Sequence, residues 1–115
     1  MKIDEKIKIF KNEIKIWSKT LQVFPYDVKL ERMKQWGYCS ADKVIYFNSD
    51  LLFKRKELQI YVIVHELLHL KIPNHGKLFQ SLMNLHIPNW KDLDKELNSM
   101  KEELSPVDSY NNSLR

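Results

Sequence analysis

The chain has 115 residues but only one cysteine, Cys39, and only two glycines. A single thiol cannot form a disulfide within the chain, and it excludes a metal site made only of thiolates. The four histidines are therefore the remaining soft ligands for a metal ion. With two glycines and four prolines the chain has few places to turn tightly, which favours a helix-rich fold with a small sheet.

Long apolar runs and localised charge are also absent. The purest apolar run, Ile60–Val64, is far too short to cross a bilayer, and Met1–Asp4 leads into a charged stretch with no signal-peptide core. Lys and Arg outnumber Asp and Glu by 19 to 15, but they form no basic stripe with interleaved aromatic residues. We therefore expect a soluble, cytoplasmic protein whose partner is neither a membrane nor a nucleic acid.

The length is near that of a common single domain, and no break in composition divides the chain. We predict one domain over residues 1–104, followed by a polar tail over residues 105–115.

The first half of the chain predicts one helix and a few strands. From Ile3 onward apolar residues recur at spacings of three and four, as in an amphipathic helix that ends near Pro25. β-Branched and aromatic residues then predict strands at Val28–Arg32, at Trp36–Cys39 and, after a turn signal at residues 40–43, at Val44–Phe47. The apolar stripe of the helix is Ile7, Phe10, Ile14, Trp17 and Leu21.

The second half predicts three more helices. The segment Glu57–Lys71 is apolar nearly all round, so we expect it to be the central, most buried helix, ended by Pro73. One further helix should begin near Gly76 and another after Asn89, an N-cap residue with Asp92 at the third helical position. The residues predicted to face inward are Leu78, Phe79, Leu82, Met83 and Leu85 in the first of these, and Leu93, Leu97, Met100 and Leu104 in the second. The fold class is therefore α+β, with a small, mostly antiparallel sheet.

Residues 65–69 read His-Glu-Leu-Leu-His inside the apolar helix, which is the H-E-x-x-H pattern of zinc peptidases. His65 and His69 are four residues apart, so both imidazoles point to the same side and can bind one ion. Glu66 is turned too far round the helix to be a third ligand but lies close enough to hydrogen-bond a metal-bound water. We therefore predict that it acts as a general base.

A catalytic zinc site needs a third protein ligand, and His75 is the main candidate. Pro73 and Asn74 break the helix and turn the chain, so that His75 can fold back toward the pair. His86 is the competitor, although its place at a helix end favours a structural role. Three acids of the last helix are weaker candidates, because such acids are usually solvated: Glu96, Glu102 and Glu103.

The chemistry predicted from these residues is metal-assisted hydrolysis of a peptide bond. Zinc would activate a water molecule and polarise the carbonyl, while Glu66 moves the proton from that water to the leaving amine. Cobalt or manganese would fit the same imidazoles. The sequence leaves open which group stabilises the oxyanion among Tyr38, Tyr46, Tyr61 and His86.

Several segments from Glu31 to Leu97 together resemble one group of families. They occur in the same order and spacing as in those families, and they are Met33–Ser40, Ile45, Phe47–Asn48, Val62–Leu70, Asn74–Gly76 and Phe79. The chain resembles the YgjP-like metallopeptidase domain, and also the SprT-like domains and the minigluzincins. The resemblance implies a minimal gluzincin-like fold with an N-terminal helix, a small sheet, a zinc helix and C-terminal helices. It also implies that the third zinc ligand is His75.

The resemblance carries further expectations about substrate and regulation. It implies an endopeptidase that acts on unfolded or exposed segments, with an extended substrate pairing to an edge strand at Val44–Phe47. It also implies latency imposed by the C-terminal segment, within one chain or between two copies in a homo-oligomer. Two rival functions remain open: an SprT-like peptidase of DNA-associated proteins, and a non-enzymatic oligomer that zinc stabilises.

Overall fold

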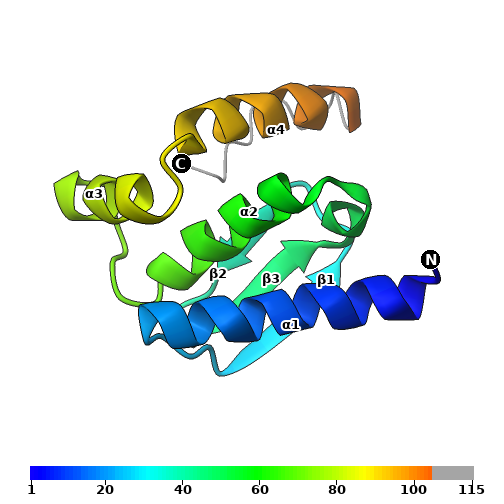
Figure 1. Cartoon of the computed structure of the whole chain (residues 1–115), viewed down its shortest axis with the longest axis horizontal. Helices are drawn as coiled ribbons and strands as arrows, with labels where there is room; N and C mark the ends of the chain where they lie inside the picture. Colours follow the sequence, from blue (N-terminus) through cyan, green and yellow to red (C-terminus); the bar gives the residue numbers. More distant parts are fainter. Residues whose placement is uncertain (105–115) are drawn as a thin grey trace.

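The computed structural model describes residues 1–104, with side chains described up to residue 100. This part of the chain forms four α-helices, one short 3-10 helix (Ser49–Phe53) and a three-stranded sheet (Figure 1). The helices α1 (Ile3–Leu21) and α2 (Lys56–Leu68) pack against each other over the sheet. In Figure 1, α1 and α4 (Trp90–Leu104) flank α2 on opposite sides. This is the α+β arrangement expected of a minimal gluzincin-like domain.

The first helix forms as its apolar periodicity predicts. Phe10 and Ile14 are buried, and the remaining residues of the stripe pack against the core. The helix ends where Gln22 adopts a left-handed conformation, with φ at 57°, and its backbone amide donates to the carbonyl of Lys19. The ring of Phe10 meets that of Phe47 edge to face at 5.2 Å between centroids, which fixes α1 on the sheet.

The sheet has the strand order β1-β3-β2, so its central strand is the last in the sequence. The strands are β1 (Asp27–Glu31), β2 (Gly37–Cys39) and β3 (Val44–Asn48). The pairing of β2 with β3 is antiparallel, whereas β1 pairs with β3 in parallel. The sheet is therefore mixed, and the predicted antiparallel character holds for one of its two pairings.

The prediction that Val44–Phe47 forms an edge strand is wrong. This segment belongs to β3, which is hydrogen-bonded on both sides. Four of the five residues of β3 are buried and one is half-buried, so both faces of the central strand are largely covered. The edges of the sheet are β1 and β2, and β2 is the edge nearer to α2.

The central helix α2 is buried along most of its length, as predicted. All eight residues from Tyr61 to Leu68 are buried, including His65 and Glu66. The regular helix ends at Leu68, three residues before the predicted end, and the next turn continues with tighter hydrogen bonds between residues three apart.

Of the two C-terminal helices, α3 buries fewer residues than predicted. In α3 (Lys77–His86), Phe79 and Met83 are buried, but Leu78 and Leu85 are 63% and 69% exposed. The prediction was wrong for these two leucines because the ten-residue helix buries only a narrow stripe, centred on Phe79 and Met83. In α4, which follows Asn89, the apolar stripe faces the core as predicted, with Leu93 and Leu97 buried and Met100 packed against them.

The side chains of Glu102, Glu103 and Leu104 and the predicted tail at residues 105–115 lie outside the described residues. Within the described part of the chain, every helix is too short or too polar to span a bilayer.

Candidate metal centre

The three histidines predicted to bind the metal, His65, His69 and His75, point their Nε2 atoms toward one another. The Nε2 atom of His69 lies 3.2 Å from that of His65 and 3.0 Å from that of His75, and the third distance, between His65 and His75, is 3.3 Å. His86 lies elsewhere, at the end of α3, where its ring meets Trp17 edge to face at 5.8 Å. The structure thus groups the main candidate with the pair and gives the competitor a packing role.

Local backbone geometry brings each of these histidines to the same point. His65 is on α2, and His69 caps that helix in a helical conformation, with φ at −66° and ψ at −15°, so the two rings are one turn apart. The chain then turns back. The side chain of Asn74 accepts a hydrogen bond from the amide of Gly76, and the carbonyl of His75 accepts one from the side chain of Gln80 on α3. These two bonds hold the turn that presents His75.

A phenylalanine supports all three imidazoles. The ring centroid of Phe79 lies 5.1 Å from that of His65, 4.9 Å from that of His69 and 4.8 Å from that of His75. It is stacked on His69 and edge-on to the other two, so it limits their rotation. The sequence predicted Phe79 as an inward-facing residue, but its position four residues after His75 did not indicate this contact.

The donor set fits a divalent metal ion. Nitrogens bound to a tetrahedral zinc ion at about 2.0–2.1 Å lie about 3.4 Å from one another, close to the spacing of these three atoms. Three neutral imidazoles cannot satisfy one another here, because each Nε2 either donates or accepts and a triangle always leaves one mismatched pair. A cation shared by the three lone pairs removes this conflict.

Burial also keeps the imidazoles in the form that binds metals. It lowers the pKa of His65 well below the ordinary value, and the neighbouring His69 and His75 lower it further. Burial also lowers the pKa of His69, although the hydrogen bond to the carbonyl of Ile72 opposes this. Both rings are therefore neutral at pH 7 and keep a lone pair for a metal ion.

Glu66 lies beside the cluster, with its side chain against β2. The residue is 2% exposed, and burial raises the pKa of its carboxyl to about 8. Gly37 on β2 leaves the space for it, because a Cβ atom at that position would lie 2.8 Å from both Cγ and Oε2 of Glu66. A neighbouring dication would favour the ionised carboxylate, which is the form needed by a general base.

A cleft of 460 Å³ opens onto this site. Its walls include Glu66, His69 and His75, and one of its rims is formed by β2 and the turn that follows it. Cys39 lies in this rim, and burial, assisted by the charge of Glu66, raises the pKa of its thiol to about 11. The thiol stays protonated at neutral pH and is therefore a poor metal ligand.

The four groups considered for the oxyanion differ in position. Tyr38 is half exposed and lines the cleft. Tyr46 lies opposite it across the sheet pairing, and their rings are 6.1 Å apart. Tyr61 is fully buried and donates to Asp94, and His86 lies at the end of α3. Tyr38 is the one of the four that borders the cleft.

Comparison with known protein families agrees with this geometry. Residues 4–100 match the family described as YgjP-like, metallopeptidase domain. The match covers most of the chain, so the chain belongs to the YgjP-like family. Its family is one of metallopeptidases, and the cluster of three histidines fits metal binding. None of the curated proteins compared with the chain matches it.

Proposed function

We propose that the protein is a zinc-dependent endopeptidase in which His65, His69 and His75 hold the metal ion and Glu66 is the general base. The observation that carries this proposal is the convergence of three Nε2 atoms within 3.3 Å of one another, next to a buried carboxyl at a cleft. A catalytic zinc site has three protein ligands and one open position, whereas a structural site is closed by four. The histidine set and its open side favour the catalytic kind.

A zinc ion held by these histidines supplies an activated water molecule and polarises the scissile carbonyl. Glu66 accepts the proton of the attacking water and delivers it to the leaving amine, for which it must be ionised. Its burial keeps competing water away and makes its basicity higher than that of an exposed carboxylate. Tyr38 is the candidate that would contact the oxyanion from the rim of the cleft.

The substrate, in this proposal, is an extended or unfolded peptide that pairs with β2. The outer edge of β2 is open within the described sheet, because the strand order ends with β2. Gly37, at the start of β2, touches Glu66, and Tyr38 and Cys39 line the cleft. A peptide added to this edge would therefore have its backbone beside the general base.

Metal content and proteolysis of single variants test the proposal. We expect His65→Ala, His69→Ala and His75→Ala to lose zinc and activity together, because each removes one of three ligands. Glu66→Gln should keep zinc and lose cleavage of a disordered substrate such as casein by about 10²–10⁴-fold or more. His86→Ala is the matched control and should keep both properties.

The proposal would be wrong if Glu66→Gln cleaved casein at the wild-type rate, or if His75→Ala retained a full equivalent of zinc. Latency through the C-terminal segment remains a prediction, since residues 105–115 lie outside the described residues.

A further inference from the structure

A series of hydrogen bonds runs from the candidate metal site to the last helix. The hydroxyl of Tyr61 lies 3.3 Å from Nδ1 of His65 and donates to Oδ1 of Asp94 on α4 at 2.9 Å. The other carboxylate oxygen of Asp94 accepts from the side chain of Asn98 at 3.4 Å. Tyr61 and His65 are buried, whereas Asp94 and Asn98 are half-buried, so the series is shielded from water at its histidine end.

The direction of these bonds follows from the chemistry of their ends. A carboxylate can only accept, so the hydroxyl hydrogen of Tyr61 points to Asp94 and its lone pairs face His65. The hydroxyl of Tyr61 can donate to Asp94 and accept from His65 at the same time, because it has one hydrogen and two lone pairs. The Nδ1 atom of His65 must then carry a hydrogen and donate it to Tyr61. The ring consequently presents a bare Nε2 to the other two histidines.

We propose that Tyr61 and Asp94 are positioning residues that hold His65 in the Nδ1–H tautomer and so couple the docking of α4 to metal binding. This inference rests on the proposed metal site. A histidine that binds a metal through one nitrogen commonly donates from the other nitrogen to a carboxylate or carbonyl, which fixes its tautomer and raises its affinity for the ion. Here a tyrosine hydroxyl stands between the imidazole and the carboxylate.

The two histidines of the H-E-x-x-H pair differ in how their outer nitrogens are held. The Nδ1 atom of His69 lies 2.9 Å from the carbonyl of Ile72, which belongs to the same turn of chain. The Nδ1 atom of His65 depends, through Tyr61, on a carboxylate 33 positions further along the chain from that tyrosine. Only the second arrangement requires α4 to be in place.

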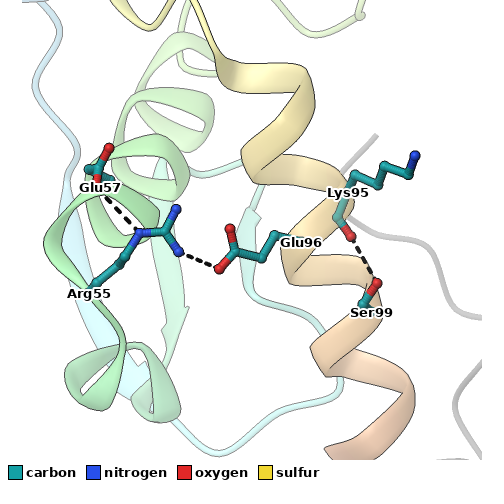
Figure 2. A network of polar contacts seen from close by, with 5 residues as sticks. All are labelled: Arg55, Glu57, Lys95, Glu96 and Ser99. Atoms are coloured by element: carbon teal, nitrogen blue, oxygen red, sulfur yellow. Dashed lines mark hydrogen bonds and ion pairs between the residues drawn. The ribbon is translucent and has the colours of Figure 1, made fainter.

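Other contacts hold α4 against the rest of the fold. The indole of Trp36, which is buried, donates to the carbonyl of Leu97 at 2.9 Å. At the beginning of α2, Arg55 pairs with Glu96, as Figure 2 shows. On α4, Asp94 precedes Glu96 and Leu97 by two and three residues, so these contacts hold the part of the helix that carries its carboxylate.

The experiment compares two variants with two matched controls in the full-length protein. Tyr61→Phe removes only the hydroxyl, and Asp94→Asn removes only the charge. Tyr46→Phe removes a hydroxyl from the sheet, and Asp92→Asn removes an exposed charge from the same helix. Zinc affinity is measured by competition with a chromophoric chelator, and the ¹⁵N shifts of His65 in metal-free protein report its tautomer.

We expect Tyr61→Phe and Asp94→Asn to bind zinc about 10–100-fold more weakly, and both controls to stay within about twofold of wild type. The ¹⁵N shifts should show His65 protonated at Nδ1 in the wild type and a mixture of tautomers in Tyr61→Phe. Far-UV circular dichroism of each variant separates this effect from unfolding, because a merely structural role would not move the tautomer of a folded protein.

Wild-type affinity in both variants, or a wild-type His65 protonated at Nε2, would overturn the inference. The tautomer measurement needs neither metal nor variant, so it decides the arrangement even if the variants are unstable. If the wild type itself bound no zinc, the proposed function would fail, while the ¹⁵N shifts would still report whether Tyr61 accepts from His65.

Discussion

The helices α2 and α4 contact each other in two regions, which differ in how far their ionisable groups are exposed to water. At the start of α2, the guanidinium of Arg55 lies between Glu57 and Glu96, and all three side chains are at least 36% exposed (Figure 2). In the middle of α2, Tyr61 contacts Asp94, and one turn further along the helix lie the buried His65 and Glu66. Charged groups at the surface keep most of their hydration, whereas the buried His65 and Glu66 lose theirs on folding. The comparison teaches that the second region lowers the stability of the fold, because it buries ionisable groups that water would otherwise hydrate.

The largest expected effect is the pH dependence that Glu66 adds to the metal-free protein. Its carboxyl has a pKa of about 8 in the folded state and an ordinary value of 4.5. Between these two pH values the folded protein holds a proton that the unfolded chain releases, so the free energy of unfolding falls as the pH rises. The measurement is urea denaturation in the presence of a chelator at pH 5 and at pH 8.5. From the lower to the higher pH, the free energy of unfolding should fall by on the order of 4 kcal/mol more in wild type than in Glu66→Gln.

The other titrating groups are the same in both proteins, so the difference between the two curves isolates Glu66. If the free energy of unfolding changed with pH in the same way in both proteins, the raised pKa of the Glu66 carboxyl would be contradicted. Glu66→Gln should also be the more stable of the two at pH 8.5, because the amide has no charge to bury.

A smaller effect is expected where β2 packs on this carboxyl. Gly37→Ala would place a methyl group 2.8 Å from the side chain of Glu66, so the buried carboxyl must move. We expect a loss of about 1–3 kcal/mol in the free energy of unfolding and a reduced rate of casein cleavage, with zinc retained. Urea denaturation, proteolysis and metal content measure the three quantities.

Gly76→Ala provides a comparison for that variant. Its methyl group would lie 2.9 Å from Oδ1 of Asn74, the atom that accepts the hydrogen bond holding the turn of His75, so we expect this variant to bind zinc more weakly. Equal losses of zinc in Gly37→Ala and Gly76→Ala would argue against a specific contact between Gly37 and Glu66.

The smallest effect is expected at the exposed contact between α2 and α4, where Arg55 pairs with Glu96. Arg55→Ala and Glu96→Gln remove one partner each from an ion pair that water and salt screen. We expect the midpoint of urea denaturation to change little and the zinc affinity to stay at the wild-type value. A large loss of zinc affinity in Glu96→Gln would show that the two regions are not independent.

Much of this architecture could be predicted because it depends on local periodicity. The apolar stripe from Ile7 to Leu21 specifies α1, and the unbroken apolar character around His65 specifies a buried helix. The grouping of the three histidines also followed from spacing, since the helix fixes one pair and the turn at Asn74 returns the chain. These inferences needed only neighbours in the sequence.

The remaining features depend on contacts between distant segments. A turn signal at residues 40–43 identifies the hairpin of β2 and β3, but no local feature indicates that β1 joins β3 in parallel. The choice of Val44–Phe47 as an edge strand failed for that reason. Tyr61 is one helical turn before His65, which hinted at their contact, whereas its bond to Asp94 depends on where α4 docks.

The strand at the rim of the cleft, β2, is only three residues long. If a peptide binds there as proposed, it can exchange main-chain hydrogen bonds over no more than a few residues, and these bonds are the same for any sequence. Selection would then depend on whether a protein offers a loose stretch of backbone rather than on which side chains it carries. Such an enzyme would act as a sensor of local unfolding in its targets, with brief binding and broad tolerance.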